Sequence, residues 1–182
     1  MSRAMPSNKP INSDSKKRRS FVALLFAAGY GPCSAAEAIV VTVELKLVSS
    51  SEDWNAYHSI RQHVLWEARG RHGSYDRSHP DEHKAGNFPC LLMVDGMEPT
   101  GAIRIDLDPP LAWFRRVAIR DDRQRQGYGR KMLELAADFA RARGCNRVRS
   151  NVDHSAVEFY QRLGFQILDE SEAATVPMTT LL

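Results

Sequence analysis

The residues with the clearest chemical potential lie between Val117 and Met132 (VAIRDDRQRQGYGRKM), where a strand pattern passes through a polar loop into a helix that begins among glycines. The first backbone N–H groups of a helix have no partner inside the helix, and the helix dipole adds partial positive charge there. Gly127 and Gly129 lack a Cβ, so a ligand can approach the main chain closely. The segment therefore predicts an anion site suited to a pyrophosphate. Four basic residues add positive charge to it: Arg123, Arg125, Arg130 and Lys131.

Sequence patterns separate the known kinds of phosphate-binding loop. A dinucleotide-binding fingerprint needs a third glycine where Met132 stands, and a P-loop needs a Gly-Lys-Ser/Thr sequence that this segment lacks. The pattern Gln/Arg-x-x-Gly-x-Gly/Ala does match, filled by Gln124, Gly127 and Gly129. A second pattern, Ala-x-x-x-Tyr-x-x-x-Gly-Phe, follows on the next predicted helix and strand as Ala156, Tyr160, Gly164 and Phe165.

These two patterns, in this order and on these elements, resemble the GNAT superfamily of N-acetyltransferases. The loop pattern alone is a weak signal, and the second pattern makes the resemblance specific. The resemblance extends from about Val41 to Leu182 and is strongest from Trp113 to Phe165. In this superfamily the loop binds the pyrophosphate of acetyl-CoA, which implies that acetyl-CoA is the co-substrate here and that no metal is needed.

The resemblance also implies roles for individual residues in binding. The family's strand before the loop splays from its neighbour and offers backbone groups to the pantetheine arm, so Val117 and Ile119 are expected contacts. A backbone N–H near Val117 would polarise the thioester carbonyl. Many relatives have Asn where Asp153 stands, so either Asn151 takes over that contact or Asp153 simply caps the next helix. The residues expected around the pyrophosphate are Gln124, Arg125, Gln126, Gly127, Tyr128, Gly129 and Arg130.

Two catalytic roles follow from the same resemblance. Tyr160 matches the tyrosine that contacts the co-substrate and often protonates the departing thiolate, as a phenol with a pKa of ~10 can do. The attacking amine must also lose a proton, because an aliphatic ammonium has a pKa of ~10.4. Relatives often carry a Glu on the strand before the loop, but residues 113–116 here are Trp-Phe-Arg-Arg. We select Glu67 as the base and leave these alternatives open: His72, Asp76, His79, Glu82, His83, Asp106 and Asp108.

Hydrophobic periodicity gives the elements that must position these residues. Strands are predicted over 41–47, 90–94, 102–107, 111–119, 147–152, 165–167 and 174–182, and helices over 51–69, 127–143 and 156–163. Asp95-Gly96 is expected to join two of the strands in a hairpin. The order β-α-β-β-β-α-β-α-β-β indicates an α/β or α+β fold with a mixed sheet flanked by helices. The family resemblance implies that this sheet is mostly antiparallel.

Composition excludes several other classes of protein. With 43% apolar and 26% charged residues in a chain of 182, the sequence is neither disordered nor collagen-like nor a coiled coil, and no apolar run is long enough for a membrane span. Cys33, Cys90 and Cys145 are far apart, which excludes a disulfide scaffold and a cysteine-based zinc site. His72, His79 and His83 stand beside acidic residues, but a solvated polar loop explains them better than zinc does.

The first forty residues are set apart from the domain over 41–182. They carry a basic run over 16–19, an apolar run over 21–28 and then small residues, the order of a secretory signal, but glycines and a proline interrupt the apolar run early. Three interpretations remain: a tail or an over-extended start, with Val41 as the alternative start; a targeting segment; or a packed helix. We favour the first. Residues 1–40 carry a net charge of +4 and the rest carries −1, so the folded part gives no signal for nucleic-acid binding.

The sequence thus predicts a cytoplasmic, acyl-CoA-dependent N-acyltransferase that acetylates a primary amine on a small molecule or a peptide, with no nucleic acid or membrane as partner. A non-catalytic acyl-CoA-binding sensor is the main alternative, and a nucleic-acid-associated protein that uses the basic tail is a third. The acceptor and the oligomeric state, a homodimer included, stay open.

Overall fold

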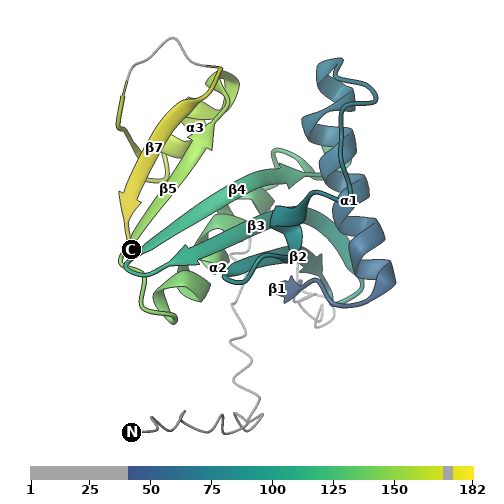
Figure 1. Ribbon diagram of the computed structural model, residues 1–182, viewed down its shortest axis with the longest axis horizontal. Helices are drawn as coiled ribbons and strands as arrows, with labels where there is room; N and C mark the ends of the chain where they lie inside the picture. The colour runs from purple at the N-terminus through teal and green to yellow at the C-terminus, as the bar shows by residue number, and fades with distance from the viewer. Residues whose placement is uncertain (1–40, 170–173) are drawn as a thin grey trace, which may run out of the picture. The chain divides into compact units, whose positions relative to one another are not determined.

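The computed structural model describes residues 41–169 and 174–182, so the expectations for residues 1–40 lie outside the described residues. Within these ranges seven strands form one sheet in the order β1-β2-β3-β4-β5-β7-β6 (Figure 1). Neighbouring strands are antiparallel except β4 and β5, which run parallel. The mixed, mostly antiparallel sheet confirms the predicted fold class. The strands are β1 (Val43–Leu47), β2 (Asn87–Val94), β3 (Glu98–Asp108), β4 (Leu111–Ile119), β5 (Arg147–Val152), β6 (Gln166–Ile167) and β7 (Val176–Leu181).

Helices cover both faces of this sheet. On one face α1 (Ser51–Leu65) packs against β2, β3 and β4, and on the other face lie α2 (Tyr128–Arg141) and α3 (Val157–Gln161). The helix predicted over 51–69 is shorter because Trp66 leaves the helical conformation, with φ −121° and ψ −62°. Short 3-10 turns complete the chain: η1 (Glu67–Arg69), η2 (Pro80–His83), η3 (Asp121–Arg123) and η4 (His154–Ala156).

The apolar run of β2 is continuous because both faces of this strand are covered. Cys90 and Leu92 belong to the core beneath α2, whereas Leu91 and Met93 belong to the core beneath α1. The expected hairpin turn after β2 is also present. Asp95 and Gly96 both have positive φ, 51° and 69°, as a two-residue type I′ turn requires.

The main irregularity of the sheet lies in β4. Strands β4 and β5 pair only where Leu111–Trp113 face Arg147–Arg149, and beyond this point they diverge (Figure 1). The register between β3 and β4 shifts in the same region, where Arg116 adopts a left-handed φ of 55°, so β4 contains a β-bulge. The second half of β4 is therefore unpaired along its β5 edge. Its backbone groups on that edge need another partner, either water or a ligand.

Candidate functional site

The opening between β4 and β5 is bounded by the C-terminal end of α1. Arg69 of η1 forms an ion pair with Asp153, which follows β5, at 2.5 Å between Nη1 and Oδ2. His63 of α1 contacts Asp121, which follows β4, at 2.9 Å between Nε2 and Oδ2. The C-terminal end of α1 and η1 therefore contact the segments that follow β4 and β5. A molecule lying in this opening meets the free edge of β4 and has α1 and η1 beside it.

The loop after β4 leads directly into the start of α2. Gly127 is the N-cap of α2 with φ 85°, and no side chain caps this helix. Lys131 makes the first helical hydrogen bond, to the Gly127 carbonyl at 3.1 Å, so the amides of the preceding turn have no intrahelical partner. A Cβ built on Gly127 would meet no atom within 4 Å, so the approach to these amides is open. The geometry therefore fits an anion such as a diphosphate.

The other residues of the loop divide into those that shape it and those that face solvent. Gln124 donates from Nε2 to the Ile119 carbonyl at 3.0 Å and to Asp121 at 2.9 Å, and Gln126 donates to the Asp122 carbonyl at 3.0 Å. These amides fix the loop conformation and are engaged within the protein. Arg125, with a left-handed φ of 60°, and Arg130 are exposed and have no ion pair among the described residues.

The positive charge expected along this segment is smaller than the sequence suggests. Arg123 donates to Glu98 at 2.7 Å, and Arg120 reaches the same carboxylate at 2.8 Å. Lys131 lies 3.7 Å from Glu134. Arg125 and Arg130 are therefore the two guanidinium groups of the loop that remain for an anion.

Gly129 and Ile119 pack against the protein itself. A Cβ on Gly129 would lie 3.2 Å from a ring atom of Phe159, so this glycine allows α2 to approach α3. The Ile119 side chain lies against Gly101 and Gly129, and its carbonyl accepts the Gln124 amide. Of the two predicted β4 contacts, half-buried Val117 is the one that lies at the bulge and beyond the paired part of the strand.

Tyr160 is buried beneath the opening, with 5% of its surface exposed. Its ring makes edge contacts with Phe159 and Phe165, at 5.5 and 5.0 Å between ring centroids. Burial raises the pKa of Tyr160 to about 12, although a hydrogen bond with Ser150 acts in the opposite direction. The phenol therefore keeps its proton throughout the neutral range and can serve as a proton donor.

Asp153 and Asn151, the two residues on the β5 side considered as contacts for the co-substrate, differ in their surroundings. Asp153 accepts the Ser155 amide at 3.0 Å and so caps η4, in addition to its ion pair with Arg69. Asn151 is exposed on β5, opposite Pro177 of β7. The structure thus gives Asp153 a local structural role and leaves the Asn151 amide accessible.

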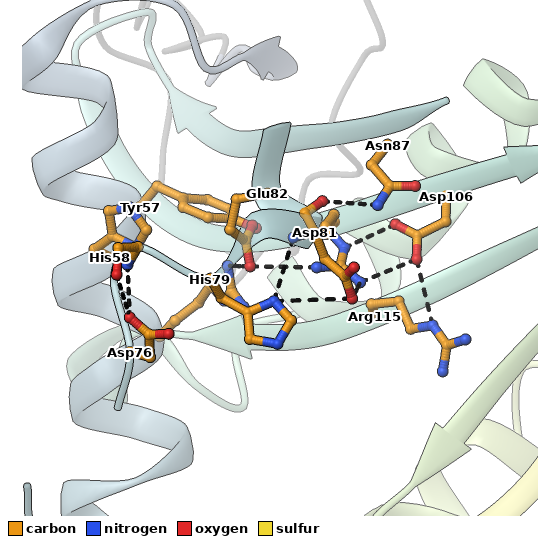
Figure 2. Close-up of polar contacts among 12 residues, drawn as sticks. Tyr57, His58, Asp76, His79, Asp81, Glu82, Asn87, Asp106 and Arg115 are labelled. Carbon is orange, nitrogen blue, oxygen red and sulfur yellow. Dashed lines mark hydrogen bonds and ion pairs between the residues drawn. The ribbon is translucent and has the colours of Figure 1, made fainter. Parts of the chain in front are cut away.

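A buried polar network joins α1, η2 and β3 on the α1 face of the sheet (Figure 2). Glu82 accepts a hydrogen bond from the Tyr57 hydroxyl at 2.8 Å and pairs with Arg61 at 2.8 Å and Arg104 at 3.3 Å. Burial disfavours ionisation of Glu82, but the charge of Arg61 and the hydrogen bonds from Tyr57 and Arg61 outweigh it, so its pKa is lowered. Glu82 is a carboxylate with both oxygens engaged, which suits an anchor for the loop better than a base.

Most of the other candidate bases also serve the loop conformation. Asp76 accepts from Ser78 at 2.8 Å, His79 accepts the Asp81 amide at 3.3 Å, and His83 packs on Trp54 with 4.8 Å between ring centroids. Asp106 is held by Arg104 at 2.8 Å. In the described part of the chain the side chains of His72 and Asp108 form no hydrogen bond or ion pair, although the charge of His72 acts on Glu67.

Glu67 differs from these residues because it lies on η1 beside the opening. It accepts from Gln62 at 2.7 Å and lies 3.5 Å from His63, whose other ring nitrogen contacts Asp121. The hydrogen bond from Gln62 lowers the pKa of Glu67, although slight burial opposes this. Glu67 is therefore ionised at neutral pH and linked through His63 to the loop after β4.

Sequence reasoning missed one histidine. His58 of α1 is buried, and its Nδ1 lies 2.8 Å from the Tyr75 hydroxyl. Burial and the charge of Arg61 lower the pKa of His58, so the ring is neutral near pH 7. Helical spacing does not place His58 on the same face as its neighbour Tyr57, and its partner Tyr75 comes from a loop whose path the sequence does not show.

No group of three or more His, Cys, Asp or Glu side chains in residues 41–169 and 174–182 is arranged to hold a metal ion. None of the helices in the same ranges is long and apolar enough to cross a membrane.

Three solved acetyltransferase structures share the fold of this chain. An acetyltransferase from Thermus thermophilus matches with a TM-score of 0.62 and 24% identity, over 78% of this chain and 97% of that one. The PaiA N-acetyltransferase from Thermoplasma acidophilum in complex with coenzyme A gives 0.61 and 13%, over 78% and 99%. The ribosomal-protein-S18-alanine N-acetyltransferase from Escherichia coli gives 0.61 and 18%, over 77% and 94%.

Comparison with curated protein sequences gives no significant match. The model of the acetyltransferase (GNAT) family, however, matches residues 51–165. This range holds α1, the diverging strands, the loop before α2 and Tyr160, so it contains every element described above as part of the opening. The chain therefore belongs to the GNAT family of acetyltransferases.

Proposed function

We propose that this protein is an acyl-CoA-dependent N-acyltransferase, which transfers an acetyl group from acetyl-CoA to a primary amine by direct attack in a ternary complex. One observation carries the proposal: the uncapped N-terminus of α2 follows directly after the strand that diverges from β5. An anion site and an unpaired strand edge thus occur side by side. Family membership and a structural neighbour that contains coenzyme A support the same assignment.

The residues of the opening fit an elongated co-substrate with a diphosphate. The amides of Tyr128 and Gly129, with Arg125 and Arg130, would hold the diphosphate, while Gln124 and Gln126 keep the loop in shape. The free edge of β4 at Val117 would bind the pantetheine amides, as an added strand would. Asn151 can reach the same arm from the β5 side.

Acetyl-CoA supplies an activated acyl group as a thioester. The main-chain N–H near Val117 would stabilise negative charge on the carbonyl oxygen as the amine attacks. Glu67, supported by His63, would take the proton of the incoming ammonium. Tyr160 would give its proton to the sulfur as the thiolate leaves. These residues lie on α1, η1, β4 and α3, the elements around the opening.

A non-catalytic acyl-CoA sensor is the alternative, favoured by the engagement of most candidate bases. Glu82, Asp106 and Asp76 are all held by other side chains. The discriminating feature is whether an amine raises the release of CoA thiol above hydrolysis. In the enzyme interpretation the acceptor is a small molecule or a peptide amine, and the reaction is cytoplasmic, where acetyl-CoA is available.

The test combines ligand binding with turnover. Calorimetry should detect binding of acetyl-CoA and of free CoA, and thiol release should rise above hydrolysis when amines from a broad panel are added. Glu67→Gln should lower kcat/KM by about 100-fold and remove the acidic limb of the pH profile, as loss of a general base does. Glu44→Gln, an exposed glutamate of β1, is the matched control and should leave activity unchanged. Binding of CoA without amine-dependent thiol release would support the sensor.

A further inference from the structure

Arg116 occupies an unusual place beside the opening. It is the bulge residue of β4, with a left-handed φ of 55°, and it directly precedes Val117. A residue other than glycine in this region of φ is strained, and such strain persists only where the surrounding structure maintains it. The guanidinium lies over the ring of Trp66, at 5.0 Å from Cζ to the ring centroid, and the residue is exposed. A long cationic side chain is thus held on the α1 side of the sheet, within reach of solvent.

The charges around Arg116 are unbalanced. Three more guanidinium groups, those of Arg61, Arg104 and Arg115, act on it electrostatically, and the Glu82 carboxylate opposes them. The acidic side chains of this region are already paired with these three: Glu82 with Arg61 and Arg104, and Asp106 with Arg104 and Arg115.

Arg116 itself has no acidic partner among residues 41–169 and 174–182. Desolvation by the groups packed around the guanidinium, and then the charges of Arg61 and Arg104, lower the pKa of Arg116, although Glu82 opposes this and an arginine stays charged at neutral pH. An anion placed here would relieve this repulsion.

The chemistry of the group indicates which anion fits. A guanidinium presents a planar fork of donors that matches a carboxylate with two parallel hydrogen bonds. The phosphates of CoA are an unsuitable partner, because their proposed site is the start of α2, whereas Arg116 points to Trp66 at the end of α1. The side of the opening that α1 lines is the side left for the amine.

We propose that Arg116 binds a carboxylate carried by the amine acceptor, so that the preferred substrates are amines bearing a carboxylate. The inference rests on the proposed acyltransferase function and specifies the substrate class of that site. The carboxylate can be the α-carboxylate of a free amino acid or the side chain of an acidic residue at a peptide N-terminus. Both sources present the same group to Arg116, and the experiment separates them.

The test uses matched acceptors with acetyl-CoA. One arm compares alanine, alaninamide and ethylamine, and the other compares dipeptide amides that begin with Asp or Asn. In at least one arm, Arg116→Gln should lower kcat/KM for the carboxylate-bearing acceptor by about 10- to 100-fold, the usual effect of a hydrogen bond to a charged group. Neutral acceptors should change less than threefold. The comparison is made between variants for each acceptor, because the amine pKa values of the acceptors differ.

Three controls define the outcomes. Arg116→Lys should restore part of the preference, and Arg147→Gln, which removes an exposed charge from the closed end of β5, should have no effect on it. The KM for acetyl-CoA should stay the same in all variants. Equal losses for charged and neutral acceptors in Arg116→Gln would overturn the inference, as would turnover without any dependence on a carboxylate.

If the protein is not an acyltransferase, the same experiment gives a different result. In that case CoA binds but no amine in either arm raises thiol release. Calorimetry of alanine and the Asp dipeptide amide, added to the protein saturated with CoA, then decides the present inference. Binding that disappears in Arg116→Gln and persists in Arg147→Gln supports the carboxylate site, and binding that neither variant changes, or no binding at all, overturns it.

Discussion

The two longest helices of the described domain begin in opposite ways. At the start of α1 the Ser50 hydroxyl accepts the Asp53 amide at 3.1 Å, and Asp53 in turn accepts the Ser50 amide at 3.3 Å, a complete capping box. At the start of α2 stands Gly127, with no side-chain cap. Side chains of the protein thus satisfy the first amides of α1, whereas those of α2 are left for a ligand. A helix end that lacks a cap on an open surface is a candidate binding site, and one that caps itself is structural.

The surroundings of the two helices differ in the same way. The α1 side is a closed network in which Tyr57, Arg61 and Arg104 surround Glu82. The α2 side is an opening whose functional groups are mostly main-chain atoms. Substitutions within the Glu82 network should therefore reduce stability first, and substitutions at the opening should reduce ligand binding or turnover first. The following predictions test this division, from the largest expected effect to the smallest.

The largest effect is expected at Glu82. Glu82→Gln leaves Arg61 and Arg104 buried without their shared counter-charge, and breaking a buried ion pair in this way costs about 3–5 kcal/mol. Denaturant unfolding should show this loss in the free energy of unfolding. Glu67→Gln, at a partly exposed carboxylate, should leave the unfolding midpoint nearly unchanged. A loss below about 1 kcal/mol at Glu82 would show that the network is not what holds the loop.

The sequence could predict features that depend on residues close together in the chain, but not contacts between separate elements. The α2 start was predictable because Gln124, Gly127 and the helix that follows act within a few residues. The network was not, because Tyr57, Glu82 and Arg104 lie on three separate elements and periodicity says nothing about their encounter. For the same reason the sequence did not show that Asp76, His79 and Glu82 make contacts that hold the loop, nor that Arg116 lies at a bulge, because a bulge depends on the pairing of two strands.

The second effect concerns turnover on the α2 side. Tyr160→Phe removes the proposed proton donor and should lower kcat by about 100-fold, equivalent to about 2.7 kcal/mol in the barrier, with little change in the affinity for acetyl-CoA. Ser150→Ala is the control, because it removes the hydrogen bond to Tyr160 and the one to the Phe114 carbonyl at 3.0 Å but keeps the phenol. It should lower kcat less. Equal activity of Tyr160→Phe and the wild type would leave Tyr160 a packing residue.

The third prediction separates the two glycines at the start of α2. Gly127→Ala forces a Cβ into a left-handed conformation and should cost about 1–2 kcal/mol of stability and weaken acetyl-CoA binding. Gly129→Ala should cost stability through its 3.2 Å contact with Phe159 instead. Phe159→Leu should therefore rescue Gly129→Ala and not Gly127→Ala, as measured by double-mutant cycles of unfolding. Rescue of both would mean that one packing effect explains both glycines.

The smallest effect contrasts the two helix starts by their dependence on pH. Burial disfavours the charged form of Asp53, but the Lys46 side chain at 2.6 Å and the amides of Ser50 and Ser49 lower its pKa on balance. A carboxyl whose pKa is lower in the folded state stabilises the fold above its unfolded pKa of ~3.9, and this contribution disappears as the pH falls through the folded value. Asp53→Asn should thus cost about 1 kcal/mol at pH 7, as loss of a cap does, and progressively less below about pH 4. The cost of Gly127→Ala should stay constant over the same range, because a backbone conformation does not titrate. Unfolding free energies measured from pH 7 to pH 3 make the comparison, and parallel curves for the two variants would mean that ionised Asp53 does not stabilise α1.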